Sequence, residues 1–179
     1  HPRPSYTDGA YDGRYVFVND KANSRVARIR LDVMKTDKMI QVPNAHSIHG
    51  LRLQRYPKTG YVFCNGENRA PIPNVGKLLD DPKKWNSVFS AIDGDTMQVA
   101  WQVKVSGNLD NNDADYQGKY VASTCYNAEE GITVADMTAS DKDHIVVFSL
   151  KAIEQAIADG KFETVNGVKL LDGTKSSKL

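Results

Sequence analysis

The clearest pattern in the sequence is a short run of aromatic and β-branched residues that follows a glycine turn and occurs three times. Its copies are Tyr15–Asn19, Tyr61–Asn65 and Lys119–Ser123. Side chains of this kind fit a pleated surface that is buried on one face, and a glycine just before them is typical of a turn. Each copy therefore predicts a β-strand that starts at a turn.

A second strand pattern lies downstream of each copy, at Arg25–Asp32, Ser87–Asp93 and His144–Leu150. In the middle copy a turn leads directly into Met97–Val105, where apolar and polar residues alternate. The repeat of about 50 to 60 residues is near the size of a β-propeller blade. We therefore expect an all-β chain with about three blades. Closed propellers have about four to eight blades, so the predicted propeller is incomplete.

One helix interrupts the strand pattern. In Leu150–Asp159 the residues Ile153, Ala156 and Ile157 form an apolar stripe, with Ser149 as the cap at the start and Gly160 at the end. We expect this helix on the rim, as an insertion. Glu67–Lys84 contains three prolines and no periodic pattern, which predicts a long loop.

Length and charge narrow the classes of function. The 179 residues suffice for one domain. With 23 Lys and Arg against 22 Asp and Glu, the chain lacks the positive field that gathers nucleic acid. It also lacks the apolar run of about 18 residues that a membrane span requires. Cys64 and Cys125 form no CxxC pattern, and a disulfide and two free thiols both remain open.

Two histidines that lie close together in the sequence could bind a metal. His46 and His49 are three apart, between Pro43 and the strand-like residues after Gly50. That context indicates the approach to a strand, so only one of the two histidines should face a shared site; a structural role is the alternative for each.

Acidic residues suggest calcium at two places. Asn111–Gly118 begins like an EF-hand loop, but Thr124 stands where such a loop needs glutamate, so a polar turn is the better interpretation. The second stretch, Tyr126–Asp143, has five carboxylates between two predicted strands. Carboxylates on irregular backbone suit a hard cation, with solvated surface acids as the alternative.

Four phrases together resemble the nitrous-oxide reductase family. They are Asp20–Lys38, Ile48–Gln54, Gly107–Tyr116 and Ser123–Asn127, and the likeness extends in order over nearly the whole chain. They match the amino-terminal domain of the family, a seven-bladed β-propeller. The resemblance implies that residues 1–179 form part of that domain, and that the family's cupredoxin domain with its dinuclear copper centre lies outside this sequence.

The resemblance also implies an activity. Members of the family reduce nitrous oxide to dinitrogen and water during denitrification, at a tetranuclear copper–sulfide cluster held by histidines. His1 and His49 match copper ligands and are the predicted catalytic residues, whereas His46 and His144 match no ligand. Arg3 stands where the family has another histidine, a departure that affects the surroundings of the cluster.

Further expectations concern calcium, partners and location. Tyr126, Glu129, Met137 and Asp143 match the family's calcium site, Tyr126 and Met137 through main-chain carbonyls. Cys64 and Cys125 resemble strand cysteines that bind no copper. The family implies a head-to-tail homodimer in the periplasm, where the partner's dinuclear copper centre passes on electrons from a c-type cytochrome or a cupredoxin.

Two other interpretations remain open. The chain could be a non-catalytic propeller that serves as a scaffold or binding module, with His1 and His49 as ordinary residues. It could also be an inactive fragment, because two histidines cannot hold a four-copper cluster. Copper analysis of the intact protein distinguishes the first of these from the enzyme.

Overall fold

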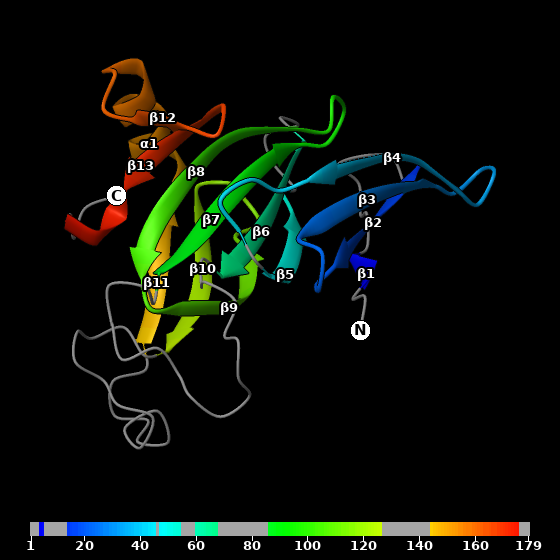
Figure 1. Ribbon diagram of the computed structural model, residues 1–179, viewed down its shortest axis with the longest axis horizontal. Coiled ribbons are helices and arrows are strands. Elements are labelled where there is room, and N and C mark those ends of the chain that lie inside the picture. Colours follow the sequence, from blue (N-terminus) through cyan, green and yellow to red (C-terminus); the bar gives the residue numbers. More distant parts are fainter. Residues whose placement is uncertain are drawn as a thin grey trace.

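Three β-sheets stand side by side in the computed structural model, which describes residues 4–5, 14–45, 47–54, 60–67, 86–126 and 144–175. The first sheet lies at one end of the molecule, and the only α-helix of the described ranges lies at the other (Figure 1). This arrangement confirms the predicted all-β architecture of successive small sheets with one short helix.

The first sheet has the order β1-β2-β3-β4, with antiparallel neighbours throughout. The predicted strands at 15–19 and 25–32 are its central pair. Its two edges were not predicted, because one is very short and the other is almost wholly polar. The bounds are β1 Pro4–Ser5, β2 Tyr15–Asp20, β3 Arg25–Arg30 and β4 Lys35–Gln41.

The second sheet is the largest, with the order β12-β13-β8-β7-β6-β5. Its first four strands in the sequence form an antiparallel meander. The hairpin of β12 and β13 then adds to the free edge of β8, where β13 runs parallel to β8. The bounds are β5 Ser47–Leu53, β6 Tyr61–Glu67, β7 Asn86–Asp93, β8 Gln98–Ser106, β12 Glu163–Val165 and β13 Val168–Asp172.

The third sheet has the order β11-β10-β9 and confirms the repeat. Its strands are β9 Asn108–Ala114, β10 Tyr120–Tyr126 and β11 His144–Ser149. The first repeated pattern forms β2, β6 and β10, and the second forms β3, β7 and β11. Within every sheet these two strands are antiparallel neighbours.

The helix α1 spans Leu150–Ala158, as the sequence predicts. Its cap is Ser149, whose hydroxyl accepts a hydrogen bond from the Ala152 amide at 3.3 Å. Gly160 follows with a φ of +73°, a left-handed conformation that suits glycine at a helix end. Ile153 and Ala156 are buried, so the predicted stripe packs on the core. A short 3-10 helix, η4 (Gly173–Lys175), follows β13.

Two apolar clusters cover opposite faces of the second sheet. One joins it to the first sheet and contains Phe17, Val26, Ile48, Val62 and Ile92. The other joins it to the third sheet, where Phe89 stacks on Phe148 with ring centroids 4.0 Å apart. The second sheet is therefore packed between its neighbours, as a propeller blade is.

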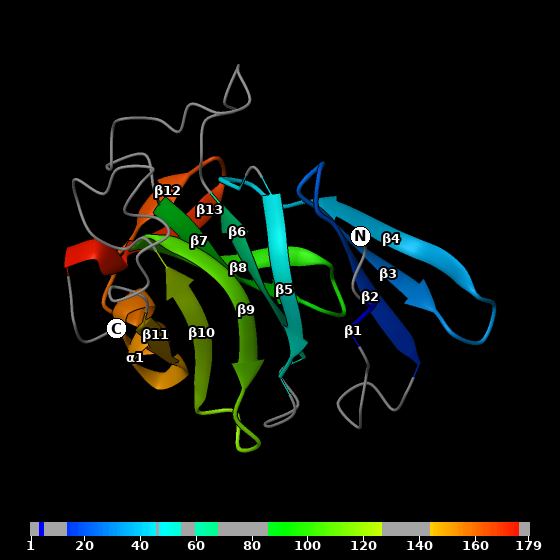
Figure 2. The same cartoon turned by 90° about the horizontal axis from the view of Figure 1, so that it is seen from below.

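Three edge strands meet on one side of this stack. β1, β5 and β9 are each an edge of their own sheet, and β5 contacts both of the others. Figure 2 shows β5 between the first sheet and β9. Residues far apart in the sequence come together along these three strands, and the predicted copper ligand His49 lies on the middle one, β5.

Candidate functional site

His49 lies on β5 at a break in its pairing with β6. It faces Asn65 across the ladder, and the register then shifts between His49 and Leu51. The residue in the shift is Gly50, whose φ of +35° is in the left-handed region. Such a β-bulge bends a strand and redirects the neighbouring side chains.

Gly50 also allows β5 and β9 to approach each other closely. A Cβ atom on this residue would lie 2.6 Å from the Asp110 carbonyl oxygen and 2.9 Å from the Asn112 amide nitrogen. Only a residue without a side chain fits against the main chain of β9 at this distance. The approach brings Asp110 to His49, 61 residues earlier in the sequence.

The imidazole of His49 is held by the carboxylate of Asp110. Nδ1 of His49 lies 2.9 Å from Oδ1 of Asp110, and the two side chains are 13% and 33% exposed. Because a carboxylate accepts, Nδ1 is the donor in this hydrogen bond, and in the neutral imidazole Nε2 carries the lone pair. Nε2 is fully buried. In metalloproteins, a carboxylate on one ring nitrogen commonly orients a histidine that binds the metal through its other nitrogen.

A buried polar network surrounds this pair. Nδ2 of Asn65 donates to the Asp110 carbonyl oxygen at 3.0 Å and to Oγ of Ser123 at 2.8 Å. Oγ of Ser123 donates to the Asn111 carbonyl oxygen at 2.9 Å. On the other side of the bulge, Nδ2 of Asn112 donates to the Gly50 carbonyl oxygen at 3.3 Å. The network ties the second sheet to the third beside His49.

The other predicted copper ligand, His1, lies outside the described residues, as do Arg3 and His46. Pro4, three residues after His1, begins β1, and β1 contacts β5, the strand of His49. His144 is exposed at the start of β11.

The predicted calcium ligands Glu129, Met137 and Asp143 also lie outside the described residues, and for Tyr126 only the main chain is described. Tyr126 is the last residue of β10. Cys125 pairs directly with His144 across the sheet, so the segment 127–143 leaves and rejoins the sheet at neighbouring positions. Within the described ranges, no three His, Cys, Asp or Glu side chains are close enough to share a metal ion.

The EF-hand-like stretch is a turn only in its second half. Oδ1 of Asp115 accepts hydrogen bonds from the Lys119 amide at 2.6 Å and the Tyr120 amide at 3.1 Å, which gives the expected polar turn. Residues 111–114, however, belong to β9. The turn prediction was wrong there, because buried polar contacts with the second sheet support a strand that lacks apolar alternation.

The two cysteines are free and buried, which decides between the alternatives left open by the sequence. Burial raises the pKa of the Cys64 thiol to about 12. Sγ of Cys125 donates to the Ser106 carbonyl oxygen at 3.4 Å. The Cys64 thiol is therefore not in the ionised form that would act as a nucleophile at neutral pH.

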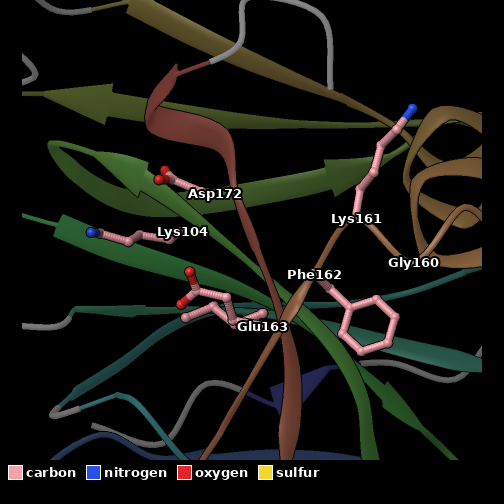
Figure 3. A pocket seen from close by; sticks show the side chains of 7 residues that line it. Lys104, Gly160, Lys161, Phe162, Glu163 and Asp172 are labelled. Atoms are coloured by element: carbon pink, nitrogen blue, oxygen red, sulfur yellow. The ribbon is translucent and has the colours of Figure 1, made fainter.

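A cavity of about 410 Å³ lies at the opposite edge of the second sheet, beside the end of α1. Figure 3 shows Lys104, Glu163 and Asp172 on one side of it and Lys161 and Phe162 on the other. Charges of both signs are spread around it and do not converge on one point. None of the predicted site residues lines this cavity.

No helix among the described residues is both long and apolar enough to cross a lipid bilayer.

Sequence patterns did not identify Asp110 as a site residue. Its contact with His49 depends on the bulge at Gly50 and on the packing of two sheets, and neither is visible in a local motif. The one signal in the sequence is its position inside Gly107–Tyr116, one of the phrases that carry the family resemblance.

Comparisons with known proteins agree with that resemblance. Residues 42–111, which include both His49 and Asp110, match the family model described as nitrous oxide reductase propeller repeat 2. The chain is 55% identical over 179 residues to a nitrous-oxide reductase of Pseudomonas fluorescens, covering 98% of this chain and 28% of that protein. It is 53% identical over 178 residues to a nitrous-oxide reductase of Stutzerimonas stutzeri, again covering 98% and 28%.

The chain thus spans less than a third of the length of these relatives. Among solved structures, the β-propeller domain of Myceliophteria thermophila Cps50 (Swd1) matches with a TM-score of 0.35 and 13% identity, over 68% of this chain and 48% of that one. The assignment of the fold rests on the sheets themselves and on the match to the propeller repeat.

Proposed function

Because the chain is homologous to the propeller region of nitrous-oxide reductases, we propose that it contributes to the copper site of an enzyme that reduces nitrous oxide to dinitrogen and water. In this role His49 is a copper ligand through Nε2, and His1 is a second ligand. The observation that carries the proposal is the hydrogen bond between Nδ1 of His49 and Asp110, which fixes the ring with Nε2 buried beside the meeting edge strands.

The chemistry of the donor fits copper. Imidazole is a preferred ligand of copper, and a carboxylate on the second nitrogen raises the basicity of the ring and limits its rotation. Asp110 supplies that carboxylate on a main chain fixed by Asn65 and by the approach at Gly50. One described histidine is a fraction of the ligands that a four-copper cluster needs, so other ligands would come from His1 and from the rest of the polypeptide.

The cluster, when bound, would bind nitrous oxide and supply electrons to it. The overall reaction takes two electrons and two protons, breaks the N–O bond and leaves dinitrogen and water. The residues of this chain would hold Nε2 of His49 in place and keep water away from the imidazole ring. The side chain of His49 is only 13% exposed.

Calcium is the second metal that we propose. Tyr126, Glu129, Met137 and Asp143 would bind it, Tyr126 and Met137 through carbonyl oxygens, because hard cations prefer oxygen ligands. The fold supports this proposal through the pairing of Cys125 with His144, which brings the two ends of this stretch of sequence to neighbouring strands. Calcium would stiffen the connection between β10 and β11.

The remaining elements of the proposal come from the family alone. The enzyme would act in the periplasm as a head-to-tail homodimer, with electrons arriving through a dinuclear copper centre of the partner subunit. A c-type cytochrome or a cupredoxin would supply that centre.

The test uses the protein expressed from its complete gene in its native host. Wild type and His49→Ala are compared for copper per polypeptide, for the sulfide-to-copper absorption band and for nitrous-oxide reduction. We expect copper, colour and turnover in the wild type, and their loss in a folded His49→Ala. A folded wild type without copper would favour a non-catalytic binding module, and full copper with normal turnover in His49→Ala would remove His49 from the site.

A further inference from the structure

The buried amide of Asn65 connects the strands that carry His49 and Asp110. Asn65 is fully buried on β6 and faces His49 across the ladder. Its Nδ2 reaches into the third sheet, to the Asp110 carbonyl oxygen on β9 and Oγ of Ser123 on β10. We propose that Asn65 is a positioning residue, which fixes β9 against β5 and β6 so that the Asp110 carboxylate meets Nδ1 of His49.

The side-chain amide of Asn65 makes hydrogen bonds through its nitrogen but not through its oxygen. This incomplete hydrogen bonding argues against a purely structural role. Among the described residues, its Oδ1 is buried and has no hydrogen-bond partner. A buried acceptor without a partner destabilises the fold, whereas an apolar side chain of the same shape avoids that cost. The two hydrogen bonds that Asn65 donates therefore explain why an asparagine, and not an apolar residue, stands at this position. Both acceptors lie in the third sheet, which carries Asp110.

A second buried amide in the same sheet shows the contrast. Gln102 on β8 is also fully buried, and its Nε2 also donates to one carbonyl oxygen, of Pro43, and one serine hydroxyl, of Ser90. Its Oε1, however, accepts a hydrogen bond from Asn44 at 2.8 Å. Gln102 is thus a fully satisfied structural amide remote from His49, and it provides a matched control.

The hydrogen bond between His49 and Asp110 tolerates little displacement of β9. His49 and Asp110 are 2.9 Å apart, and a separation of about 3.6 Å is no longer a hydrogen bond. A shift of β9 by well under 1 Å would release the imidazole and change the orientation of Nε2. Losing such an orienting group typically weakens metal binding by about 10- to 100-fold.

The inference rests on the proposed copper function, and its test separates the two. Asn65→Leu and Gln102→Met are made in the protein from the complete gene, produced in its native host. Copper per polypeptide and the visible charge-transfer spectrum are measured for each, and Tm is measured after copper removal. We expect Asn65→Leu to keep the metal-free Tm within a few degrees, to bind copper at least about 10-fold more weakly, and to change the spectrum. Gln102→Met should lower Tm and keep wild-type copper and colour.

The possible results separate the positioning role of Asn65 from the copper function. Wild-type copper content and spectrum in a folded Asn65→Leu would overturn the positioning role and leave the copper function standing. A wild type without copper would overturn the function itself. If Asn65→Leu does not fold, Ser123→Ala, which removes one anchor of the amide, takes its place. It should weaken copper binding several-fold, and an unchanged copper content would overturn the role.

Discussion

The guanidinium of Arg28 holds the carboxylate of Asp37 through two parallel hydrogen bonds, Nε to Oδ1 at 3.0 Å and Nη2 to Oδ2 at 2.7 Å. Its Nη1 donates to the carbonyl oxygens of Gly94 and Asp95, at 2.8 and 2.9 Å, in the turn between β7 and β8. The group also lies 4.3 Å from the centre of the Tyr15 ring. One arginine, 5% exposed, thus fastens the first sheet to the second.

Arg28→Met should lower the free energy of unfolding by about 2–3 kcal/mol, because it leaves Asp37 and two carbonyl groups without their donor. The value is below that for a wholly buried pair, since the Asp37 side chain is 26% exposed. Arg30→Met is the control: its partner Asp32 is 60% exposed, so solvent screens this pair and the loss of stability should be much smaller than for Arg28→Met. Chemical denaturation measures both, and equal losses would contradict the role of Arg28.

The same pair predicts a dependence on pH. The hydrogen bonds from Arg28 lower the pKa of Asp37 below 3.8, against the opposing effect of burial. A carboxyl with a lowered pKa contributes stability above its unfolded pKa and loses that contribution as pH falls through the folded value. Asp37→Asn should therefore be less stable than the wild type at pH 6, and the difference should shrink below about pH 4. A difference that is constant from pH 6 to pH 2.5 would exclude this linkage.

Sequence patterns predicted the strands whose apolar side chains pack on a neighbouring sheet. β2, β6 and β10 carry aromatic and β-branched residues, and these patterns gave their positions and the repeat. β4 was missed because its seven residues are nearly all exposed and polar. β9 was missed for another reason: it buries the polar residues Asn108 and Asn112, and Asn112 donates a hydrogen bond to the Gly50 carbonyl oxygen in the second sheet.

The sequence allowed individual residues of the site to be predicted, but not the contacts between them. His49 was predicted through the family resemblance, and the strand after it through the pattern Leu51–Leu53. Asp110 and Asn65 were not predicted, since their roles arise from contacts between sheets. The bulge at Gly50 creates those contacts, and a glycine in a strand pattern does not by itself indicate what approaches it.

The thiols provide a test of the core. Burial raises the pKa of Cys64 to about 12, and Cys125 is also buried. Neither should react with iodoacetamide at pH 8 in the folded protein, and both should react after denaturation. Peptide mass spectrometry measures the alkylation of Cys64 and Cys125 separately from that of any other cysteine in the protein. Alkylation of Cys64 in the native state would contradict its burial.

Gly50 gives a test of the approach between β5 and β9. In Gly50→Ala the new Cβ would meet the Asp110 carbonyl oxygen at 2.6 Å, so the strands must separate. We expect a loss of stability of about 2–3 kcal/mol and a loss of copper. Gly167→Ala is the control, because its φ is +80° but no atom lies within 4 Å. It should cost about 1 kcal/mol and leave copper unchanged, and similar copper contents in the two variants would argue against the approach.

Asp110→Asn isolates the carboxylate at nearly constant shape. An amide can present either a donor or an acceptor to Nδ1 and no longer carries the negative charge that favours the Nδ1–H form. Copper binding should weaken by about 10- to 100-fold while the metal-free fold is retained. Copper titration of the metal-free protein measures this, and wild-type affinity would show that Asp110 does not orient the ligand.

The most direct test is anomalous X-ray diffraction at the copper absorption edge, on crystals of the protein purified from its native host. We predict an anomalous peak about 2 Å from Nε2 of His49, a usual distance from a metal to imidazole nitrogen, with Asp110 on Nδ1. Copper elsewhere in the protein and none at His49, or an imidazole bound to Asp110 through Nε2, would contradict the account.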